Sequence, residues 1–83
     1  MKMMAEVIFL DPLDVKPATA ELNELGFRVE VLEHLIDPYG PAVWIELAGE
    51  SKLNQSQFFD WIDRIVTPLG GDVLEAGYKE AAS

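Results

Sequence analysis

The chain of 83 residues carries six lysines and arginines against fifteen aspartates and glutamates, giving a formal net charge of −9, and it contains no cysteine. Disulfides, thiolate metal sites and cysteine nucleophiles are therefore excluded. An acidic excess of this size repels nucleic acid and anionic membrane surfaces, and it favours a basic protein partner. The hydrophobic fraction of 49% is that of a folded chain, and we expect a single domain over residues 1–83.

The first ten residues superficially suggest a signal peptide. Glu6 interrupts the apolar run, and Asp11-Pro12 ends it without a small-residue cleavage site. No stretch approaches the roughly 20 apolar residues that span a bilayer. We therefore expect a cytoplasmic protein that does not bind membranes.

The first part of the chain predicts a strand followed by a helix. Ala5–Leu10 is a short apolar run, which favours a buried strand over a helix. The helix begins either with Asp14 as its N-cap or with Pro17 at its first position. Gly26 is expected to end it as a left-handed residue.

Two strands joined by a turn come next. Residues 27–31 alternate apolar and charged side chains, as in a half-exposed strand, and the phase slips at Val31-Leu32, which predicts a bulge. Residues 37–41 are rich in proline and glycine and predict the turn of a hairpin. The second strand of the hairpin is Pro41–Gly49.

The second helix is predicted over Asn54–Val66, with Asn54 and Gln57 in the spacing of a capping box. Pro68 and Gly70-Gly71 indicate its end. Residues 73–78 form the last strand, and residues 80–83 are expected to fray.

The element order is thus strand, helix, strand, strand, helix, strand. Two right-handed βαβ units of this kind place both helices on one face of an antiparallel sheet, which predicts an α+β, ferredoxin-like βαββαβ two-layer sandwich. In that fold the first and third strands are central. The opposite face of the sheet then has no cover of its own.

Trp44 is expected on this uncovered face, because Val43, Ile45 and Leu47 alternate toward the helices. Neighbouring strands are expected to add apolar side chains: on the first strand either Val7 and Phe9 or Ile8 and Leu10, and on the last strand either Tyr78 with Leu74, or Val73. Burying an apolar patch of ~500 Å² is worth roughly 12 kcal/mol before the costs of association.

We therefore expect a non-catalytic interaction or regulatory module. It would form a homodimer or bind a protein partner, for which the negative charge favours a basic protein, with Trp44, Phe9 and Tyr78 as contact residues. An alternative leaves Trp44 flat on the sheet, half shielded by edge side chains and the C-terminal tail. No catalytic, cofactor or metal residue is assigned.

A second alternative is a small-molecule-binding or enzymatic dimer with its site in the cleft between subunits. His34 is the single histidine, and no second acid or nucleophile is in view to join it. Gly70-Gly71 follows a helix, whereas glycines that bind phosphate precede one. Aromatic residues on central strands are also found in RNA-binding sheets, but the cations that phosphate requires are scarce here.

The layout from Leu25-Gly26-Phe27 through Phe59, Trp61 and Ile62 to Gly70-Gly71-Asp72 is similar to the ribonuclease E regulator B family. That family comprises small, acidic, ferredoxin-like proteins thought to inhibit an RNA-degrading enzyme by binding it. The likeness covers most of the chain. The family's aromatic-Asp-Gly-Trp run near the C-terminus is missing, and residues 73–78 stand in its place. The resemblance implies an acidic adaptor or inhibitor.

Overall fold

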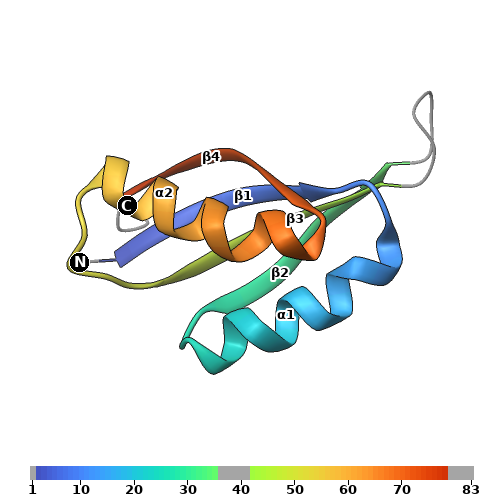
Figure 1. Cartoon of the computed structure of the whole chain (residues 1–83), viewed down its shortest axis with the longest axis horizontal. Helices are drawn as coiled ribbons and strands as arrows, with labels where there is room; N and C mark the ends of the chain where they lie inside the picture. The colour runs from blue at the N-terminus through green and yellow to red at the C-terminus, as the bar shows by residue number, and fades with distance from the viewer. Residues whose placement is uncertain (1, 36–41, 79–83) are drawn as a thin grey trace.

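A computed structural model describes residues 2–35 and 42–78, which form four strands, two α-helices and two short 3-10 turns. In chain order these are β1 (Lys2–Phe9), η1 (Pro12–Asp14), α1 (Val15–Glu24), β2 (Arg28–Leu35), β3 (Ala42–Glu50), α2 (Gln55–Val66), η2 (Thr67–Leu69) and β4 (Gly71–Tyr78) (Figure 1). The turn expected at residues 37–41 and the tail at residues 80–83 lie outside the described residues.

The strands make one antiparallel sheet in the order β2-β3-β1-β4. The central positions of β1 and β3 are as predicted. The fold is therefore α+β, with a four-stranded antiparallel sheet and two helices, and its strand order is consistent with the expected ferredoxin-like sandwich.

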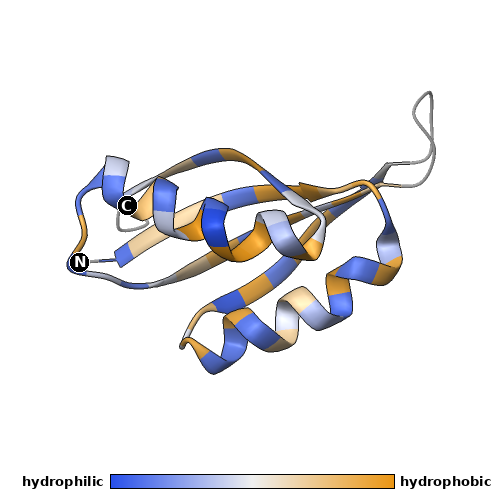
Figure 2. Ribbon diagram, in the orientation of Figure 1, coloured by the Kyte–Doolittle hydropathy of each residue, from blue (hydrophilic) through white to orange (hydrophobic). Residues whose placement is uncertain are grey.

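Both helices lie on the same face of the sheet (Figure 1). Alternate side chains of the two central strands are buried beneath them, as the pairs Val7 and Ile45, and Ala5 and Leu47, illustrate. Both helices carry hydrophobic and hydrophilic residues in Figure 2, and their core residues recur at the three- and four-residue spacing of an amphipathic helix. From the helices, the core receives Ala18, Leu22, Phe58, Ile62 and Val66.

The second helix begins as its sequence predicts. The Asn54 side chain accepts a hydrogen bond from the Gln57 backbone N–H at 2.9 Å, and the Gln57 side chain accepts one from the Asn54 N–H at 3.2 Å. This confirms the capping box. Gly26 and Gly70 adopt left-handed φ values of 94° and 87°, which is the conformation expected for a glycine after a helix.

The start of the first helix agrees in position with the first of the two predicted alternatives, but not in its capping contact. Asp14 occupies the N-cap position, but its side chain makes no capping hydrogen bond, and Pro17 is the third helical residue. Asp11 instead caps the preceding 3-10 turn by accepting from the Leu13 N–H at 3.0 Å. The acidic side chain that caps the start of this helical segment is thus Asp11, one turn before Asp14.

Two register shifts shape the sheet. The shift between Val31 and Glu33 in β2 confirms the predicted bulge. A second shift, between β1 and β4 at Glu6/Val7, was not predicted. It leaves Leu74 as the extra residue of β4, so the face that the following side chains occupy differs from the one that simple alternation assigns.

Three aromatic rings pack together where the chain enters β2 beside α2. Phe27 lies 6.0 Å from Phe58 and 5.5 Å from Trp61 between ring centroids. Phe27 also packs on Gly49, where an added Cβ would come within 2.6 Å of the ring. Among the described residues, no helix is long and apolar enough to cross a membrane.

Candidate functional site

The side of the sheet that faces away from the helices, hereafter the open face, is the candidate site. One cross-strand row on it contains Trp44, whose partner is Ile8 on β1 and Glu33 on β2. Asp72 of β4 continues this row beside Ile8. Trp44 and Ile8 are both half-buried. We call Glu33, Trp44, Ile8 and Asp72 the tryptophan row.

The next row along the strands consists of glutamates alone. Glu30 of β2 pairs with Glu46 of β3, Glu46 pairs with Glu6 of β1, and Glu6 pairs with Glu75 of β4. All four strands therefore contribute a carboxylate to one line across the sheet, which we call the glutamate row. Adjacent strands lie about 4.8 Å apart, so the row spans about 14 Å. Like charges placed directly opposite in a sheet destabilise it.

Within this row, burial and the neighbouring charges change the pKa of Glu6. Its pKa is raised above the ordinary glutamate value, first by desolvation, then by the negative charges of Glu75 and Glu46, and last by a hydrogen bond with Glu75. Each cause disfavours the ionised carboxylate. Glu6 and Glu46 lie on the two central strands, and each has a glutamate on both sides. Glu30 and Glu75 lie on the edge strands, and each has a glutamate on one side.

The indole N–H of Trp44 lacks a hydrogen-bond acceptor among the described residues. This Nε1 atom is buried. A buried donor without an acceptor costs about 1–3 kcal/mol. Trp44 therefore contributes apolar area to the open face without the polar contact that a buried indole usually makes.

Of the three contact residues predicted from the sequence, Trp44 alone lies on the open face. Phe9 is fully buried in the core beneath the helices, so its assignment as a contact residue is wrong. The alternative neighbour, Ile8, is the one that pairs with Trp44. Tyr78 pairs with Met3, a core residue, because the β4 bulge shifts it to the helix side, where it is 48% exposed.

The open face is also less apolar than predicted. A continuous apolar patch was expected, but the glutamate row separates the Trp44–Ile8 pair from Met4 and Ala48, which form the next pair along the strands. The expectation failed because it followed the apolar side chains of each strand and left out the glutamates between them. The surface is acidic with apolar side chains on each side of the row.

Among the described strand residues, seven acidic and two basic side chains lie on the open face. The basic ones are Arg28 and Lys2, which share a hollow of about 70 Å³ with Glu30, Glu46 and Ala48. The acidic ones are Glu6, Glu30, Glu33, Glu46, Glu50, Asp72 and Glu75. This face therefore holds much of the negative charge of the molecule.

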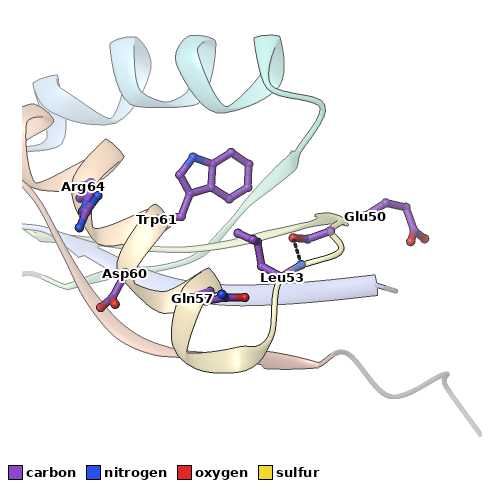
Figure 3. A pocket seen from close by; sticks show the side chains of 7 residues that line it. Glu50, Leu53, Gln57, Asp60, Trp61 and Arg64 are labelled. Atoms are coloured by element: carbon purple, nitrogen blue, oxygen red, sulfur yellow. Dashed lines mark hydrogen bonds between the residues drawn. The ribbon is translucent and has the colours of Figure 1, made fainter.

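A separate depression of about 640 Å³ lies beside α2 (Figure 3). Trp61 and Leu53 provide its apolar part, and the Leu53 backbone N–H donates to the Ser51 Oγ at 3.1 Å. In Figure 3 the Asp60 side chain points away from the indole, and the Glu50 side chain points outward from the depression. The polar groups around it do not converge on one point, as they do in a specific small-molecule site.

His34 lies on β2, is exposed, and lines neither this depression nor the hollow on the open face. Within residues 2–35 and 42–78, no group of three or more histidine, aspartate or glutamate side chains has an arrangement that could hold a metal ion. The pocket with converging carboxylates that the enzymatic alternative requires is not seen around this histidine.

Sequence analysis did not identify the glutamate row. Each of its members stands among apolar neighbours in its own strand, which is a visible signal. Their alignment across the sheet depends on the register between strands, and that register includes two bulges. Periodicity along one strand does not report it.

No protein-family model matches the chain, and a search of the curated proteins finds no match either.

Proposed function

We propose that the chain is a non-catalytic, protein-interaction module that binds a basic protein partner through the open face of its sheet. The observation that supports this most directly is the glutamate row, which crosses the whole uncovered face beside Trp44 and Ile8. Four carboxylates in register cost the isolated molecule free energy, and lysine or arginine side chains of a partner would offset that cost.

Charge favours such a partner over a second copy of the chain. A two-fold dimer would bring the open face against itself, placing one glutamate row near the other. With a net charge of −9, the two copies also repel each other before contact. A basic partner is instead attracted before contact, and after it has docked the Trp44–Ile8 pair supplies apolar contact area.

We further infer a ferredoxin-like classification from the strand order and the shared helix face, and a cytoplasmic location from the absence of cysteine. The class of acidic adaptor or inhibitor, implied by the resemblance to the ribonuclease E regulator B family, agrees with this proposal. Sheets of this architecture serve many activities, so the argument depends on the open face and not on the fold.

The test is a titration of the ¹⁵N-labelled chain with a lysine- and leucine-rich peptide, followed by amide chemical shifts. We expect the shifts to concentrate on β1, β3 and β4 around Glu6, Glu46 and Glu75. In the double variant E6Q/E46Q the affinity should fall about fivefold, because two exposed charge pairs of about 0.5 kcal/mol each are lost.

The matched control is E21Q/E24Q, which removes the same charge from exposed positions of α1 on the helix side. It should retain nearly the wild-type affinity. An equal loss in both variants, or shifts concentrated on the helices, would show that the peptide responds to overall charge alone and would overturn the proposal.

A further inference from the structure

The open face has a shape and charge pattern that distinguish among basic partners. Its two rows, the glutamate row and the tryptophan row, run across the strands. They are two residues apart along the central strands β1 and β3, and three apart along β2 and β4, which contain the bulges. Two residues of a strand span about 7 Å, and the glutamate row is about 14 Å long. A bound segment must therefore be wide enough to contact both rows and must present cations along a line that crosses the strands.

An extended segment does not meet these requirements. A strand occupies about 4.8 Å in width, so it covers one row and leaves the other uncovered. Its side chains on one face recur about every 6.7 Å, and four of them span about 20 Å, which exceeds the length of the glutamate row.

An α-helix does meet them. Its diameter with side chains is about 10–12 Å, which covers two rows about 7 Å apart. Side chains on one side of a helix recur once per turn, every 5.4 Å, so four of them span about 16 Å. Lysine and arginine side chains are long and flexible enough to absorb the remaining difference of about 2 Å.

We propose that the partner segment is a basic amphipathic α-helix that lies across the strands of the open face. Its cations, at positions i, i+4, i+7 and i+11, face Glu30, Glu46, Glu6 and Glu75, and an adjacent apolar stripe contacts Trp44 and Ile8. This inference rests on the proposed function, because it specifies the partner of the same face.

The face itself favours a segment of protein over a small polycation. The hollow among the described open-face residues holds about 70 Å³ and lies at one end of the glutamate row, next to Arg28 and Lys2. Small ligands bind in concave sites of several hundred Å³, whereas a flat face of two rows suits an element of secondary structure.

Two 16-residue, alanine-based peptides of identical composition test the inference. In the striped peptide, four lysines occupy positions i, i+4, i+7 and i+11, and leucines form the adjacent stripe. In the shuffled peptide, the same residues are spread around the helix. Amide and indole ¹H–¹⁵N shifts of the wild-type chain give both the dissociation constant and the place of binding, and spermine serves as the small polycation.

We expect the striped peptide to bind about tenfold more tightly than the shuffled one, to gain helical circular dichroism on binding, and to shift the Trp44 indole resonance. The advantage should disappear in the Trp44→Lys variant. If both peptides bind the open face equally, the proposed function stands and the helix is wrong. If spermine matches the striped peptide, the site is one for a small polycation. If neither peptide binds, both proposals fail.

Discussion

Glu6 shows how one ionisable side chain links the sheet to pH. Its pKa is raised, so the folded chain holds this proton more tightly than the unfolded chain does. Between the ordinary glutamate pKa and the raised one, the folded state binds more protons, and stability therefore falls as the pH increases through that window. Above the window the whole cost of ionisation is present.

Glu6→Gln should remove this cost. At pH 7 we expect the variant to be more stable than the wild type by about 0.5 kcal/mol, because an unfavourable cross-strand charge is lost. Below the ordinary glutamate pKa the two proteins should be equally stable, since Glu6 is then protonated in both states. Urea unfolding at a series of pH values measures the difference.

The matched control is Glu30→Gln at the end of the row, where one glutamate is a cross-strand neighbour and Arg28 lines the same hollow. It should stabilise the protein less than Glu6→Gln does. A gain from Glu6→Gln that is equal at pH 3 and pH 7 would contradict the electrostatic explanation.

Trp44 provides a second test at the level of single residues. Trp44→Phe removes the buried Nε1 donor, which has no acceptor among the described residues, and keeps an aromatic ring on the sheet. The free energy of unfolding should stay the same or increase by up to about 1 kcal/mol, because the cost of the unpaired donor offsets the smaller buried area.

Trp44→Ala gives the comparison, since it loses the ring as well as the donor. We expect it to destabilise the protein by about 2 kcal/mol, less than in a full core because the indole is half-buried. If Trp44→Phe destabilises as much as Trp44→Ala, the indole N–H has a partner in solution and the argument fails.

Among the elements, α2 was the most predictable from the sequence. Its amphipathic stripe, its capping box at Asn54 and Gln57, and the glycine that follows η2 are all local signals, and the structure shows each of them. Local patterns of this kind are set by residues three or four apart, so one segment contains all the information needed to identify them.

The capping box can be tested directly. Asn54→Ala removes the side-chain acceptor for the Gln57 backbone N–H and should lower the free energy of unfolding by about 1 kcal/mol. Asn54→Asp keeps a carboxylate oxygen in the same place, so it should retain nearly the wild-type stability. Thermal unfolding of the three proteins compares them, and equal losses in both variants would contradict the capping role.

The sheet was predictable in its order but not in its alignment. Alternation within β3 correctly placed Trp44 on the side away from the helices. The bulge at Leu74 has no comparable signal, and it is the reason that Tyr78 lies opposite Met3 on the helix side. Phe9 was misplaced because both faces of β1 are rich in apolar side chains, so its pattern alone allowed either phase.

At the level of the whole molecule, the two faces of the sheet have different roles. One face forms the core with both helices, and the other carries seven acidic side chains among the described strand residues. The stability of the fold comes from the first face. The open face carries charges that repel one another and disfavour folding. A basic partner bound there would turn this repulsion into net attraction.

This asymmetry predicts that salt weakens the binding of a basic peptide and strengthens self-association of the chain. At 0.1 M salt the Debye length is about 10 Å, so the charges on the open face are screened from partner charges that lie farther away than this, and added salt weakens the attraction progressively. Between about 20 mM and about 500 mM salt, the dissociation constant for a four-lysine peptide should increase about tenfold, and E6Q/E46Q should show a weaker dependence. Self-association of the chain through the same face should instead strengthen with salt, because like charges are screened.

Isothermal titration calorimetry measures the salt dependence of peptide binding, and sedimentation velocity measures that of self-association. Tighter peptide binding at high salt would show that apolar contacts with Trp44 and Ile8, and not the glutamate row, determine the affinity of this face.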